Sequence, residues 1–291
     1  MTAPQQEFLV RLVSGGRTSP PSSLFGQVMP FRSRPDTLYK YLAPDRIDVL
    51  HSFRLRFTPP NRFNDPFESL PRVGRPNRES IRKKLQPDED LGELMRHAIP
   101  FFQEHGPQHV LDATSKIFGV LSLARVTRHP LLWGHYASGH RGFAIGFTRE
   151  HEWFHRPKRP QPPIDAVRPV SYRWRRPKVD IGYAEDFTRP QIRRIAKGML
   201  FTKDRAWRYE KEWRVVRPLD DADHIAKNDD EVVHLFTYPA AAVAEIIAGA
   251  RARMELVEQL REVATDLEVP LYQTELSASS YRLRLARLDE R

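Results

Sequence analysis

The spacing of apolar and polar positions along the chain predicts a series of short strands. Successive side chains of a strand point to opposite faces, so a half-buried strand alternates between apolar and polar residues. Short apolar or alternating runs with this character recur along the sequence and are too short for most helices. They lie at 52–57, 118–123, 142–147, 167–172, 232–236, 243–249, 271–276 and 282–288.

Helical spacing of apolar residues predicts fewer elements. Three segments have this spacing, and they cover 131–137, 191–202 and 254–267. Asp36 is expected to cap a short helical turn over 37–42, because its side chain can accept from a free backbone N–H. Residues 72–116 have weaker helical spacing that prolines interrupt. They are predicted to form a helical insertion.

These elements together predict an α+β fold with a mixed, mostly antiparallel sheet core and inserted helices. Residues 1–35 are rich in Ser, Gly, Pro and Arg and have little periodicity. Segments of this composition bury little apolar surface, so we expect a poorly ordered N-terminal arm. Residues 36–291 are expected to form a single domain that contains the helical insertion.

The composition narrows the class of protein. The chain has 291 residues, 40% of them hydrophobic, which is enough for a substantial core. There is no run of about 18 apolar residues, so no segment is expected to span a membrane. The start of the chain does not resemble a secretory signal. Cysteine is absent, which excludes disulfides and thiolate nucleophiles and is typical of a cytoplasmic protein.

The positive charge is concentrated in one part of the chain. The net charge is +10, and between Arg149 and Arg217 there are 19 Lys or Arg residues against 9 Asp or Glu residues. A basic zone of this size attracts polyanions, such as nucleic acid, a nucleotide or an anionic surface. The alternative is a basic surface without a specific partner.

The segment Trp207–Arg214 contains two glutamates, Glu210 and Glu212, among large aromatic residues. If the segment is a strand, both carboxylates point to one face and repel each other. A repelled pair can hold one carboxylate at a raised pKa, which is a common property of active sites. The alternative is a solvated strand face on which nearby arginines neutralise the pair. These arginines are Arg205, Arg208 and Arg214.

A second polar group lies in the loop 59–68. The loop is dense in turn-forming residues, yet it contains Phe63 and Phe67, so we expect it to fold back onto the core. Its polar residues are Asn64, Asp65 and Glu68. They either contact a substrate or metal, or they form an Asx turn with Glu68 solvated beside it. Histidines 129, 135 and 140 suit no standard metal motif, and no metal is expected.

The chain resembles a widespread bacterial family known only as a domain of unknown function, which is often encoded near mobile elements and defence genes. The resemblance covers about residue 36 to the C-terminus. The matching stretches are 39–41, 62–68, 120–123, 132–137, 142–147, 170–172, Lys203, 207–214 and 245–249.

In the order of its polar residues, the chain also resembles ADP-ribosyltransferases. That family has an aromatic residue, Arg or His on an early strand, a Ser or Tyr in the middle, and a Glu-x-Glu or a single Glu late. The corresponding residues here are Tyr39 or Tyr41, Ser122 or Tyr136, and Glu210 with Glu212. Three basic residues lie near the early position, namely His51, Arg54 and Arg56.

This resemblance implies an enzyme that uses NAD and modifies nucleic acid or protein. Glu212 would polarise the ribose 2′-hydroxyl and stabilise positive charge on the ribose. Glu210 would orient or deprotonate the acceptor. Ser122 and Tyr136 complete the expected catalytic set. The expected NAD-binding residues are Tyr39, Lys40, Tyr41, Trp133, Lys203 and Arg208, with Lys203 and Arg208 on the pyrophosphate.

Two other functions remain open. In a metal-dependent nuclease, Asp65, Glu68, Glu210 and Glu212 would hold Mg²⁺, while Lys203 or Lys211 would stabilise the scissile phosphate. In a non-enzymatic module of a defence or toxin system, the basic zone would bind nucleic acid and the aromatic residues would be core. Nucleic acid is the expected partner in each case, with an antitoxin or another protein as a further one.

Overall fold

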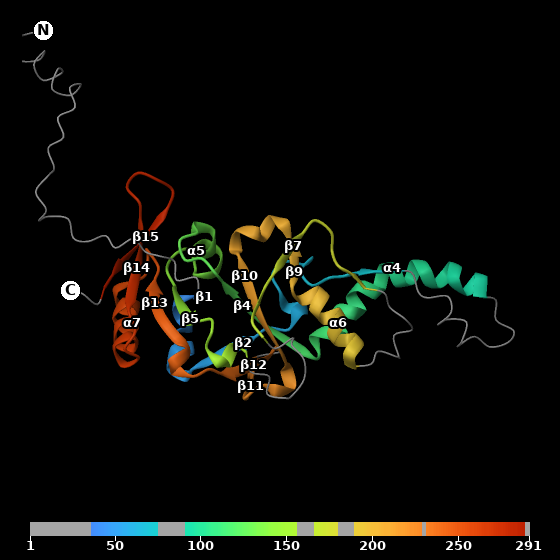
Figure 1. The fold of residues 1–291 in the computed structure, drawn as a ribbon, viewed down its shortest axis with the longest axis horizontal. Coiled ribbons are helices and arrows are strands. Elements are labelled where there is room, and N and C mark those ends of the chain that lie inside the picture. Colours follow the sequence, from blue (N-terminus) through green and yellow to red (C-terminus); the bar gives the residue numbers. More distant parts are fainter. Residues whose placement is uncertain (1–35, 75–90, 156–165, 180–188, 229–230, 289–291) are drawn as a thin grey trace, which may run out of the picture. The chain divides into compact units, whose positions relative to one another are not determined.

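The computed structural model describes residues 36–74, 91–155, 166–179, 189–228 and 231–288, which lie within one compact unit, Arg34–Arg291. Figure 1 shows the arrangement of its helices and strands. The predicted arm over 1–35 lies outside the described residues, and so does the part of the predicted insertion at 75–90.

The core is an eight-stranded mixed sheet of order β15-β14-β13-β5-β1-β4-β10-β6. All neighbours are antiparallel except β13 and β14, which are parallel. This confirms the predicted α+β fold with a mostly antiparallel sheet. The strands are β1 (Thr37–Leu42), β4 (Phe118–Ala124), β5 (Phe143–Thr148), β6 (Arg168–Pro169), β10 (Glu212–Pro218), β13 (Val243–Ala248), β14 (Leu271–Leu276) and β15 (Leu283–Arg287).

A three-stranded antiparallel sheet lies beside this core, in the order β11-β12-β2. Its strands are β2 (Arg54–Phe57), β11 (His224–Asn228) and β12 (Glu231–Thr237). Thr58 and Val120 form a bridge that ties the end of β2 to β4. Two parallel pairs complete the described strands, namely β3 (Arg72–Val73) with β8 (Lys178–Val179), and β7 (Ser171–Arg173) with β9 (Thr202–Asp204).

The helices cover different parts of these sheets. In the described residues the α-helices are α2 (Asp48–Ser52), α4 (Leu91–Ser115), α5 (Pro130–Tyr136), α6 (Arg189–Leu200) and α7 (Met254–Asp266). The 3₁₀ helices are η1 (Pro44–Arg46), η2 (Pro60–Arg62), η3 (Glu152–Phe154), η5 (Arg205–Glu210), η6 (Leu219–Asp221) and η7 (Ala240–Ala242). None of the helices in the described residues combines the length and apolar character that crossing a bilayer requires.

Helix α7 packs on β13 and β14 and connects these two parallel strands (Figure 1). Its apolar residues at helical spacing, including Leu256, Leu260 and Val263, are buried in the main core with Phe143 and Ile246. Elsewhere α4 and α6 belong to a separate apolar cluster that includes β8. Residues of β1, β4 and β10 line a cavity, together with residues of α5.

The predicted helical turn over 37–42 is wrong, because this segment is strand β1. All six of its residues pair with β5, and five of the six are buried. A central strand buried on both faces does not alternate between apolar and polar residues, so the pattern missed it. Pairing in the sheet outweighs the local capping signal of Asp36.

The prediction of one strand through 207–214 is also wrong. Asp204 caps the 3₁₀ helix η5, with its side chain accepting from the Ala206 N–H at 2.8 Å, and the helix continues to Glu210. Lys211 then adopts a left-handed conformation with φ of 45°, and β10 begins at Glu212. Glu210 and Glu212 therefore approach each other through a turn, not through strand alternation.

The predicted strand at 167–172 is divided between two partners. Residues of β6 pair with β10, whereas β7 pairs with β9. The change occurs at Val170, whose N–H donates to Glu212 O, while the next N–H, of Ser171, donates to Phe201 O. Pro169 lacks an N–H, so it suits the end of a short edge strand. In α4, by contrast, Pro100 and Pro107 lie inside the helix without ending it.

Candidate functional site

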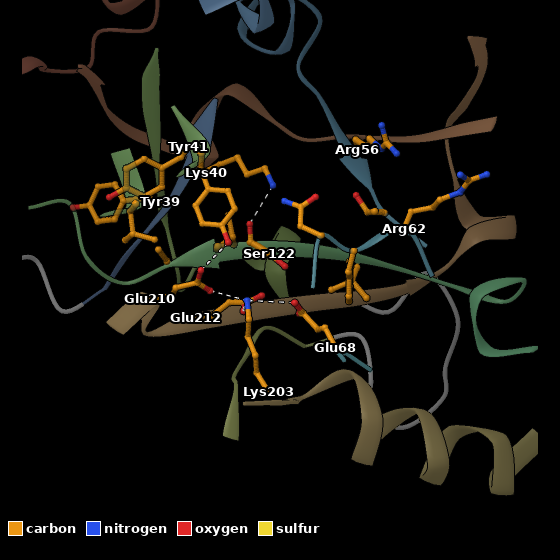
Figure 2. Close-up of a pocket in the computed structure, with 18 residues that line it drawn as sticks. Tyr39, Lys40, Tyr41, Arg56, Arg62, Glu68, Ser122, Lys203, Glu210 and Glu212 are labelled. Carbon is orange, nitrogen blue, oxygen red and sulfur yellow. Dashed lines mark hydrogen bonds and ion pairs between the residues drawn. The ribbon is translucent and has the colours of Figure 1, made fainter. Parts of the chain in front are cut away.

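A cavity of about 350 Å³ is lined by residues of β1, β2, β4, β9 and β10 and of the loop after η2. In Figure 2, Tyr39 and Tyr41 lie at one end and Arg56 and Arg62 at the other, with a cluster of carboxylates along one side. Ligand pockets have volumes of about 300–1,000 Å³. The cavity is therefore large enough for part of a dinucleotide.

Lys203, on β9, joins three carboxylates on the cavity wall (Figure 2). Its Nζ lies 2.7 Å from Oε2 of Glu210, 2.9 Å from Oε2 of Glu212 and 3.4 Å from Oε2 of Glu68. The side chains of all four residues are at most 7% exposed. The ammonium thus neutralises carboxylates that would otherwise repel each other.

Arg214, on β10, is the second cation of this cluster and is fully buried. Its Nε donates to Oε1 of Glu212 at 2.7 Å, and its Nη2 donates to Oε2 of Glu212 at 3.1 Å and to Oε1 of Glu68. Its Nη1 donates to Leu200 O at 2.6 Å. Arg214 and Glu212 are two residues apart on one strand, so they share a face of the sheet.

These contacts shift the pKa values of the carboxylates in different directions. Burial raises the pKa of Glu212, but Arg214 and Lys203 outweigh this effect and lower it to about 2. For Glu68, burial is the larger effect and raises its pKa despite Arg214 and Lys203. The pKa of Lys203 is raised, because the three carboxylates outweigh the effect of burial. Glu212 is therefore ionised at neutral pH.

Three hydroxyl groups hold the glutamates in place. Tyr136, at the end of α5, donates to Oε1 of Glu210 at 2.7 Å. The Glu212 N–H donates to the Tyr172 hydroxyl at 2.7 Å, and the Ser122 hydroxyl helps to keep the pKa of Glu212 low. Burial and the charge of Glu210 raise the pKa of Tyr136, so this hydroxyl stays protonated. Both glutamates are thus fixed on two sides.

Basic side chains line another part of the cavity. Lys40, on β1, has its Nζ 3.3 Å from Ser122 O, and burial lowers its pKa to about 8. Arg56 pairs with Glu231 through Nη2, while its Nε is buried without a hydrogen-bond partner. Arg62 is exposed and also lines the cavity. This end of the cavity offers donors that suit an anionic group such as phosphate.

Most of the residues predicted from the sequence line this one cavity. They are Tyr39, Lys40, Tyr41, Ser122, Tyr136, Lys203, Glu210 and Glu212. Of the three basic residues considered for the early position, Arg56 lines the cavity and His51 and Arg54 do not. The segments that carry these residues are far apart in sequence, and the sheet brings them together.

Three predicted contacts with NAD do not fit the geometry. Trp133 is fully buried, packs edge-on against Tyr41 at 5.1 Å between ring centroids and donates from Nε1 to Thr127 O, so it is a core residue. Arg208 is exposed and does not line the cavity. Lys203 is engaged by three carboxylates, which leaves it little capacity for a pyrophosphate.

The prediction for the loop 59–68 is correct in part. Asp65 does form the Asx turn, accepting from the Phe67 N–H at 2.9 Å, and it also accepts from Trp207 Nε1 at 2.8 Å. Phe63 packs on the core, but Phe67 is 66% exposed. The Asx-turn alternative placed Glu68 in solvent, whereas its side chain is buried against Lys203 and Arg214. The aromatic residues in this loop were the available signal for its burial.

The carboxylate cluster does not have the donor set of a metal site. Glu68 and Glu212 lie close enough to share Arg214 and Lys203, but these two side chains occupy the positions between the carboxylates. Asp65 is turned to Trp207. Within the described ranges, no three His, Asp or Glu side chains are arranged to hold a metal ion. Divalent cations need free carboxylate oxygens, which the lysine and arginine already engage.

Residues 132–215 match a family described as a protein of unknown function (DUF2971). This segment includes five of the matches on which the resemblance was based, and it confirms the resemblance there. They are 132–137, 142–147, 170–172, Lys203 and 207–214. It covers less than a third of the chain but contains Tyr136, Lys203, Glu210, Glu212 and Arg214. No curated protein and no solved structure matches the chain.

Proposed function

We propose that the protein is an enzyme that cleaves NAD in this cavity and transfers ADP-ribose to nucleic acid. The observation that carries the proposal is Glu212, a buried and ionised carboxylate that lines the same cavity as Lys40, Arg56 and Arg62. A negative charge near a row of basic donors suits a ligand that has a ribose beside its phosphates. The strongly basic segment 149–217 favours nucleic acid as the acceptor.

The chemistry of the lining supports NAD as the donor. Lys40, Arg56 and Arg62 would hold the pyrophosphate, because all three side chains line the cavity and are donors. Tyr136 and Phe63 offer ring surface for a base. NAD supplies an activated ribose, because its bond to nicotinamide breaks with the electron pair leaving on the nicotinamide nitrogen.

Glu212 would stabilise the positive charge that develops on the ribose as this bond breaks. A fixed carboxylate in a partly dry site acts more strongly on such charge than one in water. Arg214 and Lys203 keep Glu212 ionised and hold its orientation, so it does not have to reorganise during the reaction. They are positioning residues, since they act on the reaction through Glu212.

Glu210 would act on the acceptor. Its Oε1 accepts from Tyr136 and its Oε2 from Lys203, so the carboxylate is oriented from both sides. As an acceptor hydroxyl or amine forms its bond to the ribose, its proton passes to Glu210 and then to solvent. The products are nicotinamide, the ADP-ribosylated acceptor and a proton, so atoms and charge balance.

A metal-dependent nuclease is the second candidate, because Glu68, Glu210 and Glu212 gather on one wall of a basic cavity. The cations between these carboxylates weigh against it. Incubation with NAD and single-stranded RNA separates the two proposals. Release of nicotinamide that persists in EDTA supports the transferase. Cleavage of RNA that requires Mg²⁺, without loss of NAD, would overturn it.

A further inference from the structure

Trp174 is an unusually exposed aromatic residue on the loop that follows β7. Its side chain is 76% exposed and lies between Arg173 and Arg175 in the sequence. The guanidinium of Arg205 lies 5.0 Å from the centroid of the Trp174 ring. A large ring that is open to solvent contributes little to the stability of the fold. The cation holds this ring in position, so the ring is available to stack with a partner.

Trp174 lines a surface groove of about 650 Å³. The groove also contains Phe67, which is 66% exposed, and Trp207, whose ring is oriented by its hydrogen bond to Asp65. A second hollow of about 740 Å³ continues from it around Trp174 and Arg176. Three aromatic side chains thus line one continuous depression.

The charge of this depression is positive. Of the residues that the structure describes, five exposed basic ones line it, namely Arg72, Arg173, Arg175, Arg176 and Lys178. Within the same described ranges, the carboxylates that line it are Asp65 and Asp204. Asp65 accepts from the Phe67 N–H and from Trp207, and Asp204 accepts from the Ala206 N–H. Both carboxylates are therefore partly engaged, and the arginines determine the field in the groove.

We infer that this groove binds single-stranded nucleic acid, with bases stacking on Trp174 and arginines contacting the phosphates. Single-strand sites combine a basic track with aromatic side chains, because every base has a face that can stack. A duplex keeps its bases stacked on each other, so its bases cannot use these rings. An acidic peptide would use the charge but gain little from the exposed aromatic residues.

The groove adjoins the cavity described above. Asn64 and Lys203 line both, and the Nζ of Lys203 lies 5.1 Å from the centroid of the Trp207 ring. Lys203 thus contacts Trp207 on one side and Glu210 and Glu212 on the other. A nucleotide stacked on Trp207 would lie only one side chain away from the two glutamates. The strand in the groove is the acceptor of ADP-ribose, an assignment that rests on the proposed function, whereas binding to the groove does not.

Fluorescence anisotropy with a labelled single-stranded RNA and its duplex tests this inference. We expect Trp174→Ala to weaken binding of the single strand about 10-fold, and Trp174→Phe to restore most of it, because a phenyl ring still stacks. Tyr281→Ala is the matched control, since Tyr281 is a fully exposed aromatic residue on the loop between β14 and β15. It should bind as the wild type does.

The salt dependence of binding tests the role of the arginines. For single strands, log K falls with log salt concentration with a slope of about −0.7 for each phosphate contact. If each arginine contacts one phosphate, replacing Arg175 and Arg176 together by Ala should make the slope less steep by roughly 1.4 units. Arg282→Ala, an exposed arginine outside the groove, should leave the slope unchanged.

The inference is overturned if the wild type does not bind the single strand, if the duplex binds as tightly, or if Trp174→Ala binds normally. If polyglutamate binds as tightly as the RNA strand, the groove recognises negative charge alone, and the inference is likewise overturned. Nicotinamide release from NAD by the wild type, measured with and without RNA, reports on the proposed function, whereas anisotropy reports on the groove. If RNA binding depends on Trp174 but the wild type releases no nicotinamide, the proposed function is refuted and the groove remains a nucleic-acid site.

Discussion

The Nζ of Lys203 lies 2.9 Å from Oε2 of Glu212, and the same ammonium also contacts Glu210 and Glu68. This contact allows carboxylates from three segments of the chain to converge while Glu212 remains ionised. Lysine thus takes the position that a metal ion has in many carboxylate clusters. All the predictions below except the one for Lys40 follow from this arrangement.

Removing the charge of Lys203 should destabilise the fold. In Lys203→Met, Arg214 faces Glu68 and Glu212 alone, and Glu210 loses its cation. Loss of one partner from a buried ion pair costs about 3–5 kcal/mol. Urea unfolding measures this difference. Lys197→Met, an exposed lysine on α6, should change stability by less than about 0.5 kcal/mol. Equal losses in the two variants would contradict the account.

The contribution of Glu212 to stability should be lost in acid. Its pKa falls from 4.5 to about 2 on folding, so the folded state favours the carboxylate. Its stabilisation is complete above pH 4.5 and is lost as the pH falls to about 2. Thermal unfolding of the wild type and Glu212→Gln across this range should show a difference that narrows with acidity. A constant difference would refute the low pKa.

Glu68 should depend on pH in the opposite direction. Burial raises its pKa on folding, so the folded state favours the protonated acid. The stability that Glu68 contributes is complete below the pKa it has in the unfolded chain. This stability is lost as the pH rises through the higher pKa that Glu68 has in the folded protein. In thermal unfolding, the stability that the wild type gains over Glu68→Gln should therefore fall as the pH rises. The stability that it gains over Glu212→Gln should instead rise with pH. The same sign in both variants would contradict this.

Much of the fold follows from patterns in the sequence, because alternating strands and short apolar runs can be recognised locally. Strands β5, β12, β13 and β14 and helix α7 lie close to where periodicity predicts them. Strand β1 does not, because it is buried on both faces and its stability comes from pairing with β5. Strand β11 was also missed, since a strand at the edge of a small sheet needs little apolar patterning.

The site was predictable to a similar degree. Glu210 and Glu212 were identified, but by an argument from strand alternation that the left-handed Lys211 invalidates. Neither alternative for Glu68, solvated beside an Asx turn or in contact with a substrate or metal, placed it beside a lysine. Nothing in its local sequence shows that a lysine more than a hundred residues later would contact it. Long-range ion pairs of this kind depend on the assembled sheet, and a single sequence does not encode their partners in any local pattern.

Lys40 should bind anions less well as the pH rises. Burial lowers its pKa to about 8, so it is charged below this pH and neutral above it. Isothermal titration with ADP-ribose should show roughly 10-fold weaker binding well above pH 8 than at pH 7, because a hydrogen bond to phosphate loses its charge. Lys40→Arg should keep its affinity over this range. A wild-type affinity that is independent of pH would exclude Lys40 from the anion site.

Tyr136→Phe should release one side of Glu210. The lost hydrogen bond to a carboxylate is worth about 1.5–3 kcal/mol, so unfolding in urea should occur at lower denaturant concentration. If Glu210 acts on the acceptor, transfer to RNA should fall more than nicotinamide release does. Tyr281→Phe is the control, because Tyr281 is fully exposed. Equal loss of both activities would place Tyr136 in NAD binding instead.

The rate of nicotinamide release from NAD by Glu212→Gln tests whether Glu212 acts in catalysis. Amide for carboxylate keeps the shape of the side chain but removes the charge that would stabilise the ribose, so we predict a loss of about 100-fold or more. Glu258→Gln on α7 should retain the wild-type rate, and circular dichroism checks that both variants are folded. A folded Glu212→Gln that releases nicotinamide as fast as the wild type, or a wild type that releases none, would contradict the account.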